Sequence, residues 1–208
     1  MSSQFGTFDS SKRAFDVVLS AAMLVVLAPV IAALCVAVRL KLGRPVFFRQ
    51  ERPGLNGRAF NLIKFRTMLI PNPEKGIESN EQRMTKFGLI LRSWSLDELP
   101  SIWNVLVGEM SLVGPRPLLP SYLPLYTAEQ ARRHEVRPGL TGLAQVNGRN
   151  DLDWDKRFKL DVEYVDNRSW ALDIRIMALT VRKVLRREGV VTAGHVVGAP
   201  FTGPKDVT

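Results

Sequence analysis

The longest apolar stretch of the chain runs from Val17 to Val38, 22 residues in which Ser20 is the one polar side chain. A run of about 20 apolar residues is long enough to cross the hydrocarbon core of a bilayer. It is too long for the apolar centre of a signal peptide, and no clear cleavage site follows it. The pattern therefore predicts a membrane helix near the N-terminus.

The flanks and the middle of this run bear on how the helix sits in the membrane. Basic residues lie on both sides of it: Lys12, Arg13, Arg39, Lys41 and Arg44. Because basic residues favour the cytoplasmic side, both ends are expected on one face. Pro29 removes a backbone hydrogen bond and bends the helix. A straight span and a re-entrant helix that enters and leaves one leaflet both stay open. Asp16 is expected to pair with Arg13 or a basic residue of the far flank, or to stay at the interface.

Shorter patterns predict the elements that follow. Two β-prone runs, residues 45–50 and 58–68, flank a Pro/Gly/Asn turn and predict a hairpin. Residues 71–83 are polar and predict a loop. Residues 139–149, between turn signals, predict a strand. Helix-type spacing or helix end signals mark several further segments: the end of 85–94, a short capped helix from Ser95 to a turn at Gly108, 129–137, 153–167 and 170–187.

The last predicted helix, residues 170–187, has one apolar and one basic face. Apolar residues recur at positions 170, 174, 177, 181 and 184–185, and the other face carries Arg175, Arg182, Lys183, Arg186 and Arg187. Such a helix can lie on an anionic membrane with Trp170 near the headgroups. The same stripe would equally suit an ordinary surface helix whose apolar side joins the core.

Composition narrows the classes of protein. The 208 residues are 46% apolar, enough for a core, and carry a formal net charge of +9, which points to an anionic partner. The single cysteine, Cys35, excludes an intrachain disulfide and a cysteine zinc site, and the two histidines form no metal-binding motif. No P-loop, dinucleotide-binding, metalloprotease, serine-hydrolase or nucleic-acid-binding motif occurs.

The adjacent acids Asp97 and Glu98, in SLDELP, are the main candidate for chemistry. Ser95 and Glu98 have the spacing of a capping box, and acids suit the first turn of a helix. Alternatively, Asp97 is a nucleophile that attacks phosphorus, and Glu98 is a ligand of Mg²⁺. Side chains that follow each other in a helix diverge by about 100°, so one could face a phosphate while the other holds a metal.

Several cations could bind the phosphate that such a nucleophile attacks. Arg116 stands between Pro115 and Pro117, whose fixed φ angles present its guanidinium from a stiff backbone. Lys64 and Arg66 alternate with an aromatic residue on a predicted strand and would share one face. Arg92, five residues before Asp97, is another candidate phosphate ligand or an interface anchor. Each of these could instead be a solvated surface residue.

Four strings together resemble one known family. They are KRAFDVVLS ahead of the proline-containing run, GRPVFFRQERPGLNGRAFNLIKFRTM, LRSWSLDELPSIWNVLVGEMSLVGPRP, and RPGLTGLAQVNGR followed by DVEY. The chain resembles the bacterial sugar transferases, specifically the small monotopic phosphoglycosyl transferases, from about residue 12 to residue 187. The resemblance favours a catalytic role for Asp97 and Glu98, which is compatible with a capping role.

The resemblance implies an enzyme that initiates membrane glycan synthesis. Such enzymes move a sugar 1-phosphate from a UDP-sugar to polyprenyl phosphate, usually undecaprenyl phosphate, and release UMP. Asp97 would form a covalent phosphosugar intermediate, and Glu98 would help hold Mg²⁺. Arg116 would bind phosphate within Pro115-Arg116-Pro117. Further positions of the family's active site fall on Lys64, Arg92, Gln145 and Asp161.

The resemblance also implies a fold and a location. We expect an α/β, compact and mostly helical membrane-associated domain with a small β-hairpin and a re-entrant N-terminal helix, on the cytoplasmic face of the bacterial inner membrane. The predicted parts are a flexible N-terminus (1–11), the membrane helix (12–44), the catalytic domain (45–188) and a partly disordered tail (189–208). In the family the helix breaks at Ser-Pro, whereas here Ala28 precedes Pro29, so the serine's bending hydrogen bond is missing. The chain is expected to be the minimal form, without the N-terminal spanning region of the large relatives.

Two other functions stay open from the sequence. A membrane-tethered basic adaptor for polyanions would account for the net charge but leaves the acids of SLDELP and the stiff GPRP loop without a function. An inactive relative could scaffold glycan assembly, although the intact acidic pair argues against it. We predict no nucleic-acid partner and a possible homodimer.

Overall fold

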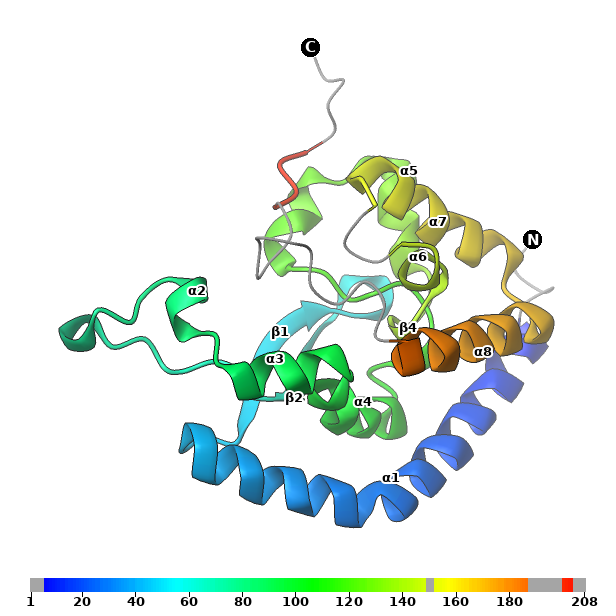
Figure 1. Cartoon of the computed structure of the whole chain (residues 1–208). Coiled ribbons are helices and arrows are strands. Elements are labelled where there is room, and N and C mark those ends of the chain that lie inside the picture. The colour runs from blue at the N-terminus through cyan, green and yellow to red at the C-terminus, as the bar shows by residue number, and fades with distance from the viewer. Residues whose placement is uncertain (1–5, 149–151, 187–199, 204–208) are drawn as a thin grey trace.

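The computed structural model describes residues 6–148, 152–186 and 200–203. Its longest element is helix α1 (Gly6–Leu42), 37 residues with Pro29 inside. Figure 1 shows that α1 bends part-way along, and that its first and last parts lie against the rest of the molecule. By length and composition, α1 is a helix that could cross a membrane. The helix begins at Gly6, so residues 6–11 are helical and the prediction of a loose segment there is wrong.

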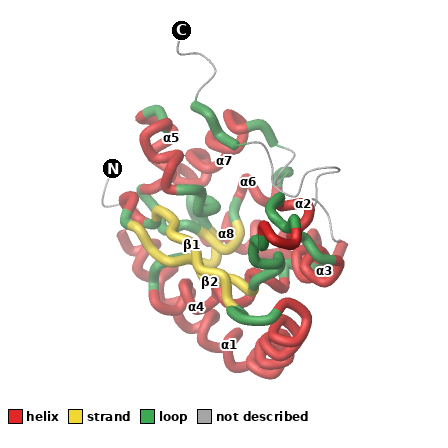
Figure 2. Tube along the Cα trace, turned by 90° about the vertical axis from the view of Figure 1, so that its left-hand side faces the viewer, coloured by secondary structure: helices red, strands yellow, loops and turns green. Residues whose placement is uncertain are grey.

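The remaining elements form a body of short helices around two small sheets (Figure 2). The strands are β1 (Phe47–Pro53), β2 (Ala59–Phe65), β3 (Ser111–Val113) and β4 (Gly139–Thr141). The α-helices after α1 are α2 (Asn80–Arg83), α3 (Lys86–Ser93), α4 (Ile102–Val107), α5 (Ala128–Ala131), α6 (Leu143–Val146), α7 (Trp154–Asn167) and α8 (Trp170–Arg186). The 3₁₀ helices are η1 (Leu55–Gly57), η2 (Pro73–Lys75), η3 (Leu96–Ser101), η4 (Pro120–Leu125) and η5 (Arg132–His134).

The first turns of α1 are held by polar contacts with the body. Lys12 Nζ lies 2.5 Å from Asp173 Oδ2 on α8, and Asp16 Oδ1 accepts a hydrogen bond from the backbone of Leu112. Arg13 donates to the carbonyl oxygens of Val105 and Leu106 at the end of α4. Asp16 thus lies near Arg13 and interacts with it electrostatically, as one of the alternatives from the sequence predicted, but its hydrogen bond is to the backbone of Leu112. The basic residues of this flank bind protein groups, because helix and strand ends leave backbone groups to satisfy.

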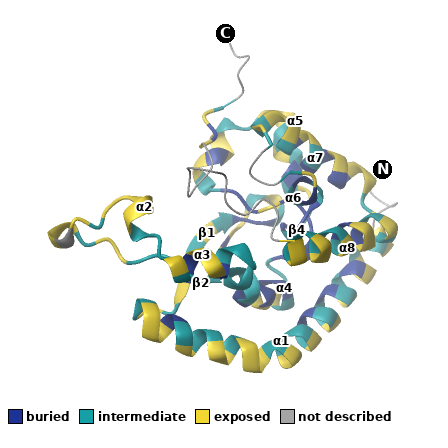
Figure 3. Ribbon diagram, viewed as in Figure 1, coloured by how far each residue is buried: buried dark blue, intermediate teal, exposed yellow. Residues whose placement is uncertain are grey.

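The middle of α1 is mostly exposed. Val25 and Val26 are 76% and 72% exposed, whereas Val38 near the C-terminal end is fully buried. Figure 3 shows the same change along the helix, with buried positions near the ends and exposed ones between them. Val38 packs with Phe65 of β2 and Leu91 of α3. Apolar side chains of the middle of α1 thus face away from the body, as a lipid-contacting segment requires.

The predicted hairpin is confirmed. Strands β1 and β2 pair antiparallel, and Phe48 lies opposite Lys64. The turn contains Asn56 (φ 55°) and Gly57 (φ 73°), two residue types that tolerate the left-handed region. Residues 71–83 contain the short 3₁₀ helix η2 and the four-residue helix α2, which follows a capping box on Ser79, and the rest of the segment is loop as predicted.

Two predicted elements are shorter than expected. Strand β4 covers Gly139–Thr141 and pairs parallel with β3, but helix α6 begins at Leu143, so the prediction of a strand through 149 is wrong. The predicted helix at 129–137 is a short α5 followed by η5. Both segments are close to the minimum length of a stable element, so tertiary contacts decide their conformation.

Helices α7 and α8 are confirmed, and α7 follows the N-cap residue Asp153, whose side chain accepts a hydrogen bond from the backbone of Lys156. On α8, Ile176 is fully buried and Asp173 is 1% exposed, whereas Ile174, Val181 and Leu185 are exposed. One side of α8 is therefore core, while a separate apolar row stays on the surface. The predicted apolar stripe is therefore not the core-facing side: the buried positions are Asp173 and Ile176, and the alternative that the stripe joins the core is wrong for Ile174, Val181 and Leu185. The alternative that this stripe lies on a membrane stays a prediction.

Part of the C-terminal tail is ordered. Phe201 is 4% exposed and packs among aromatic rings of η4 and α7, including Tyr122, Trp154 and Phe158. Residues 200–203 of the tail, which was predicted to be partly disordered, are thus anchored, because a large aromatic side chain gains free energy on burial. The rest of the predicted tail lies outside the described residues.

Candidate functional site

The acidic pair lies just after a sharp change of chain direction. Helix α3 ends at Ser93, Ser95 adopts the left-handed conformation (φ 55°, ψ 21°), and η3 begins at Leu96. A serine seldom occupies this region, so the turn depends on surrounding contacts. The side chain of Ser95 makes no capping hydrogen bond, and the predicted capping box is wrong. The turn instead brings the end of α3 and the first turn of η3 together.

Glu98 is the anionic centre of the site. Its Oε1 accepts hydrogen bonds from Lys64 Nζ at 2.6 Å and from Arg116 Nη2 at 2.8 Å. Burial alone would raise the pKa of Glu98, but the charges and hydrogen bonds of Arg116 and Lys64 outweigh burial and lower it. Glu98 is therefore ionised throughout the neutral range, and it joins residues from β2, η3 and the loop after β3.

Asp97 has a different environment from its neighbour. Burial and the adjacent charge of Glu98 raise the pKa of Asp97 to about 6, against the opposing effects of Lys64, Arg92 and Arg116. Two adjacent carboxyl groups whose pKa values are pushed apart are typical of sites in which each has its own task. At neutral pH Asp97 is mostly ionised, and it is a better nucleophile than a carboxylate held by two cations.

Arg92 lies beside this pair at the end of α3. Its Nε donates a hydrogen bond to Thr67 Oγ1 at 3.0 Å, and it interacts electrostatically with Asp97 and Glu98. Burial lowers the pKa of Arg92, although these two carboxylates oppose the effect. The position fits a cation that balances an anionic ligand next to Asp97, as the sequence predicted.

The backbone of Arg116 is fixed from behind by a buried ion pair. Arg133 Nη2 donates to the carbonyl oxygen of Arg116 at 2.6 Å and lies 2.8 Å from Asp161 Oδ2. The side chains of Arg133 and Asp161 are 1% and 2% exposed. Asp161 thus acts on the site through Arg133, and its place is behind the PRP loop (Pro115 to Pro117) and not among the reacting groups.

The PRP loop rests on a close packing of glycine backbones. A Cβ atom on Gly139 would lie 2.1 Å from the backbone nitrogen of Gly114, and one on Gly142 would lie 2.1 Å from the oxygen of Gly114. Pro115 accepts a hydrogen bond from the backbone of Gly139. Any larger residue would push the loop outward, so the three glycines set the depth at which Arg116 is held.

Gln145 lies beneath the same loop. Its Nε2 donates to the carbonyl oxygen of Leu140, and its Oε1 is buried without a hydrogen-bond partner among the described residues. A Cβ atom on Gly142 would be 3.2 Å from this oxygen. The contacts of Gln145 support the loop and do not reach Asp97 or Glu98.

Arg66 and Pro29 lie outside the site. Arg66 follows the end of β2 and donates to the carbonyl oxygen of Leu42 at the end of α1. The predicted shared anion-binding face of Lys64 and Arg66 is therefore wrong, because the strand ends between them at Phe65 and the alternation stops there. Pro29 lies in the exposed part of α1, where it can act only on the membrane helix.

Sequence reasoning missed three residues that shape the site. Arg133 fixes Arg116, Thr67 holds Arg92, and Arg52 Nη1 lies 3.4 Å from the carbonyl oxygen of Pro117. Arg133 stands in a run of charged residues and gives no local signal. Arg52 begins the string RPG (52–54), but the string by itself does not show that Arg52 lies near Pro117.

Asp97 and Glu98 are the groups of this site that could bind a divalent cation. Among the residues that the structure describes, no group of three or more His, Cys, Asp or Glu side chains is placed to hold a metal ion. Lys64 and Arg116 share one oxygen of Glu98, so its second oxygen is the ligand that Glu98 could offer. Magnesium is often bound by one or two carboxylates together with substrate phosphates and water, and Asp97-Glu98 fits that mode.

The arrangement suits chemistry on a phosphate ester or anhydride. Three cations, Lys64, Arg92 and Arg116, surround two carboxylates, so added negative charge can be accepted. Asp97 is the group available to attack phosphorus, because the hydrogen bonds of Lys64 and Arg116 go to Glu98. A site of this type can form and break an acyl phosphate.

Known proteins resemble the chain over most of its length. Residues 7–187 match the family model described as bacterial sugar transferase. The uncharacterized sugar transferase EpsL of Bacillus subtilis is 54% identical over 198 residues, which cover 95% of this chain and 98% of EpsL. The exopolysaccharide production protein ExoY of Rhizobium meliloti is 36% identical over 201 residues, which cover 86% of this chain and 87% of ExoY.

Some larger proteins match this chain over only part of their own length. The UDP-glucose:undecaprenyl-phosphate glucose-1-phosphate transferase of Escherichia coli is 42% identical over 183 residues. The match covers 83% of this chain but 39% of the E. coli protein. The chain therefore spans about two fifths of that relative.

Proposed function

Because the chain belongs to the bacterial sugar transferase family, we propose that it transfers a sugar 1-phosphate from a UDP-sugar to undecaprenyl phosphate and releases UMP. The observation that carries the proposal is the unequal carboxyl pair, in which cations hold Glu98 and Asp97 is left to react. The names of related proteins from E. coli and Rhizobium meliloti support the substrate class and a place in exopolysaccharide synthesis.

The reaction proceeds in two displacements at one phosphorus atom. An oxygen of Asp97 attacks the phosphorus that carries the sugar, the bond to the bridging oxygen breaks, and UMP leaves with that oxygen and its electron pair. An oxygen of undecaprenyl phosphate then attacks the same phosphorus. The acyl-phosphate bond breaks, and the Asp97 carboxylate is restored.

The cations of the site have separate tasks in these steps. Arg116 and Lys64 orient Glu98 and face the phosphate oxygens, and Arg92 balances charge beside Asp97. Glu98, with Asp97 beside it, would hold Mg²⁺, which when bound supplies positive charge against the phosphate oxygens. Arg133 and Asp161 keep the PRP loop at the depth from which Arg116 can reach the donor.

The membrane arrangement is part of the proposal. Both ends of α1 pack on the same body while the middle is exposed, which supports a re-entrant helix in one leaflet on the cytoplasmic face of the inner membrane. Such an anchor would hold the site where a water-soluble donor and a lipid phosphate can both be reached. Cysteine labelling at Ser11 and Lys41, which are both exposed, tests it, and accessibility from opposite membrane faces would rule it out.

The chemistry is tested by trapping the intermediate. The purified protein is incubated with Mg²⁺ and a panel of labelled UDP-sugars, and we expect UMP release and a labelled protein whose modified residue maps to Asp97. Asp97→Asn should abolish both, and Glu51→Gln, which changes an exposed acid on β1, should leave both unchanged. UMP release that survives Asp97→Asn would defeat the assignment, and no UMP release from the wild type would favour the basic adaptor.

A further inference from the structure

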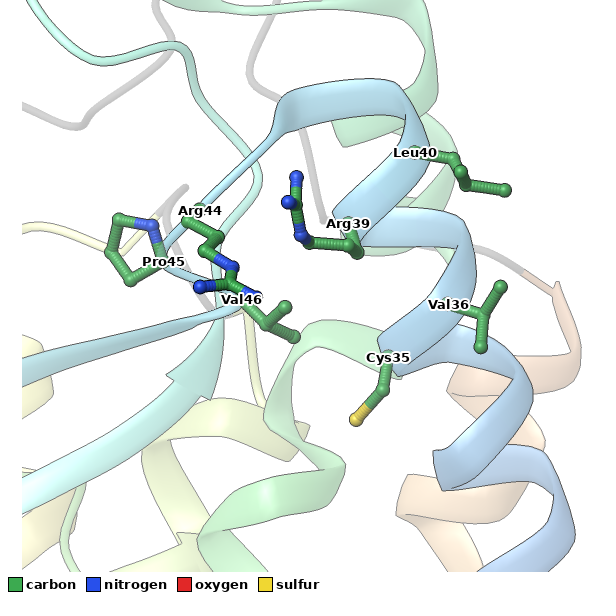
Figure 4. Close-up of a pocket in the computed structure, with 7 residues that line it drawn as sticks. All are labelled: Cys35, Val36, Arg39, Leu40, Arg44, Pro45 and Val46. Carbon is green, nitrogen blue, oxygen red and sulfur yellow. The ribbon is translucent and has the colours of Figure 1, made fainter.

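A groove whose lining does not include the acidic pair lies at the C-terminal end of α1. It has a volume of about 580 Å³ and is lined by Cys35, Val36, Arg39, Leu40, Arg44, Pro45 and Val46. Figure 4 shows the guanidinium groups of Arg39 and Arg44 in the space between α1 and the segment that leads to β1. Val36 and Leu40 point to the outer side of the helix in the same view.

The groove has two chemical characters. Five of its seven lining residues are apolar, and the two others are arginines. Both arginines are exposed, and the ion pairs among the described residues involve neither of them. Val36 and Leu40 are 59% and 78% exposed. A ligand with an anionic head and an apolar tail matches this pairing, because arginine binds phosphate and exposed aliphatic side chains favour a hydrocarbon chain.

The groove is at the end of the membrane-facing part of α1. The apolar run of the sequence ends at Val38, and Arg39 follows it directly. Arginines at this point lie at the depth of lipid headgroups when the preceding turns are in hydrocarbon. The headgroup of an amphiphile in the membrane would therefore lie at the same depth as the two arginines of the groove.

The groove is also close to the catalytic segment. Cys35 and Val46, which line it, pack in the same apolar cluster as Leu96 and Leu99, the residues on either side of Asp97-Glu98. Val46 accepts a hydrogen bond from Arg66, and Phe48, two positions further on, lies opposite Lys64. Two positions along a strand correspond to about 7 Å, so the backbone of Val46, which lines the groove, is about that far along the hairpin from the position that pairs with Lys64.

We propose that this groove is the loading site for the lipid acceptor. Arg39 and Arg44 bind its phosphate, and Val36 and Leu40 contact its first isoprenoid units, before the phosphate moves along the hairpin to Lys64 and the reacting centre. The inference rests on the proposed function, since it concerns the second substrate of the same reaction. It assigns a substrate to residues that take no part in the chemistry at Asp97.

Binding of radiolabelled undecaprenyl phosphate to the detergent-solubilised full chain tests the groove without any chemistry. The double variant Arg39→Ala/Arg44→Ala should raise the Kd about tenfold or more, because two charge-assisted contacts are lost. Arg39→Lys/Arg44→Lys should restore part of the affinity. Lys41→Ala removes an exposed cation of the same helix turn that does not line the groove, and it should bind as the wild type does.

Turnover provides the second readout. In the double alanine variant the apparent KM for undecaprenyl phosphate should rise about tenfold while the KM for the UDP-sugar keeps its wild-type value. An equal loss in the Lys41→Ala protein would overturn the proposal, as would unchanged binding in the double variant. Weaker binding to phosphatidylglycerol vesicles with an unchanged acceptor KM would assign the groove to bulk phospholipid and also overturn it. Failure of the proposed function gives a different result, a wild type that binds the lipid phosphate but releases no UMP.

Discussion

Replacing Asp97 by asparagine should stabilise the protein while it abolishes catalysis. Burial and the charge of Glu98 raise the pKa of Asp97 from 3.8 to about 6, so at neutral pH the folded state carries an unfavourable negative charge. This rise corresponds to about 3 kcal/mol, because a tenfold change in a protonation equilibrium is worth about 1.4 kcal/mol. Solvent screening at this half-buried position reduces the expected gain to about 1–2 kcal/mol.

The pH dependence has a definite sign. Below about pH 4 the carboxyl group is protonated in both the folded and the unfolded state, and above about pH 6 it is ionised in both. The wild type should therefore lose stability relative to Asp97→Asn as the pH rises from about 4 to 6, and the difference should stay constant above that. Formation of the covalent intermediate needs the ionised carboxylate, so its rate in the wild type should rise over the upper part of this range and level off above about pH 7.

Thermal unfolding in detergent across this pH range measures the effect. The Tm of Asp97→Asn should exceed that of the wild type by about 2–8 °C at neutral pH, since about 1 kcal/mol changes the Tm of a chain of this size by 2–4 °C. Glu98→Gln is the matched comparison and should have the opposite sign, because it removes the charge that Lys64 and Arg116 bind. A lower Tm for Asp97→Asn, or a difference that does not vary with pH, would refute the reasoning.

Three further substitutions test how the site is supported. Asp161→Asn leaves Arg133 as an unpaired buried charge, so we expect a loss of about 3 kcal/mol in the free energy of unfolding. The covalent adduct should still form in a single turnover at low temperature. An unchanged Tm with no adduct would instead place Asp161 among the reacting groups. Gly142→Ala puts a Cβ atom 2.1 Å from the oxygen of Gly114, so it should lower the free energy of unfolding by about 1–3 kcal/mol and reduce kcat. Wild-type values of both the Tm and kcat would contradict the packing argument. Phe201→Ala should lower the free energy of unfolding by about 3–5 kcal/mol, as measured by denaturant unfolding, and a smaller loss than about 1 kcal/mol would show that the ring is not part of the core.

Local patterns in the sequence were sufficient for the elements that have strong periodicity or clear end signals. The apolar run predicted the long helix α1, alternation and a turn predicted the β1–β2 hairpin, and helical spacing predicted α7 and α8. In each case the residues that decide the conformation are neighbours in the chain. The candidate residues Asp97, Glu98, Arg116 and Lys64 could likewise be named from residue type and motif, and the structure brings them within hydrogen-bonding reach or into one charge cluster.

Tertiary structure decided which of these groups bind each other and which only support them. The sequence could not show that Glu98 is held by Lys64 and Arg116, 34 and 18 residues away, or that Asp161 reaches the site through Arg133. It also suggested a capping box where Ser95 instead turns the chain, and it placed Lys12 at the membrane where the residue binds Asp173. A side chain's partner depends on the charges, burial and backbone groups that folding places around it, and these come from segments that are distant in the chain.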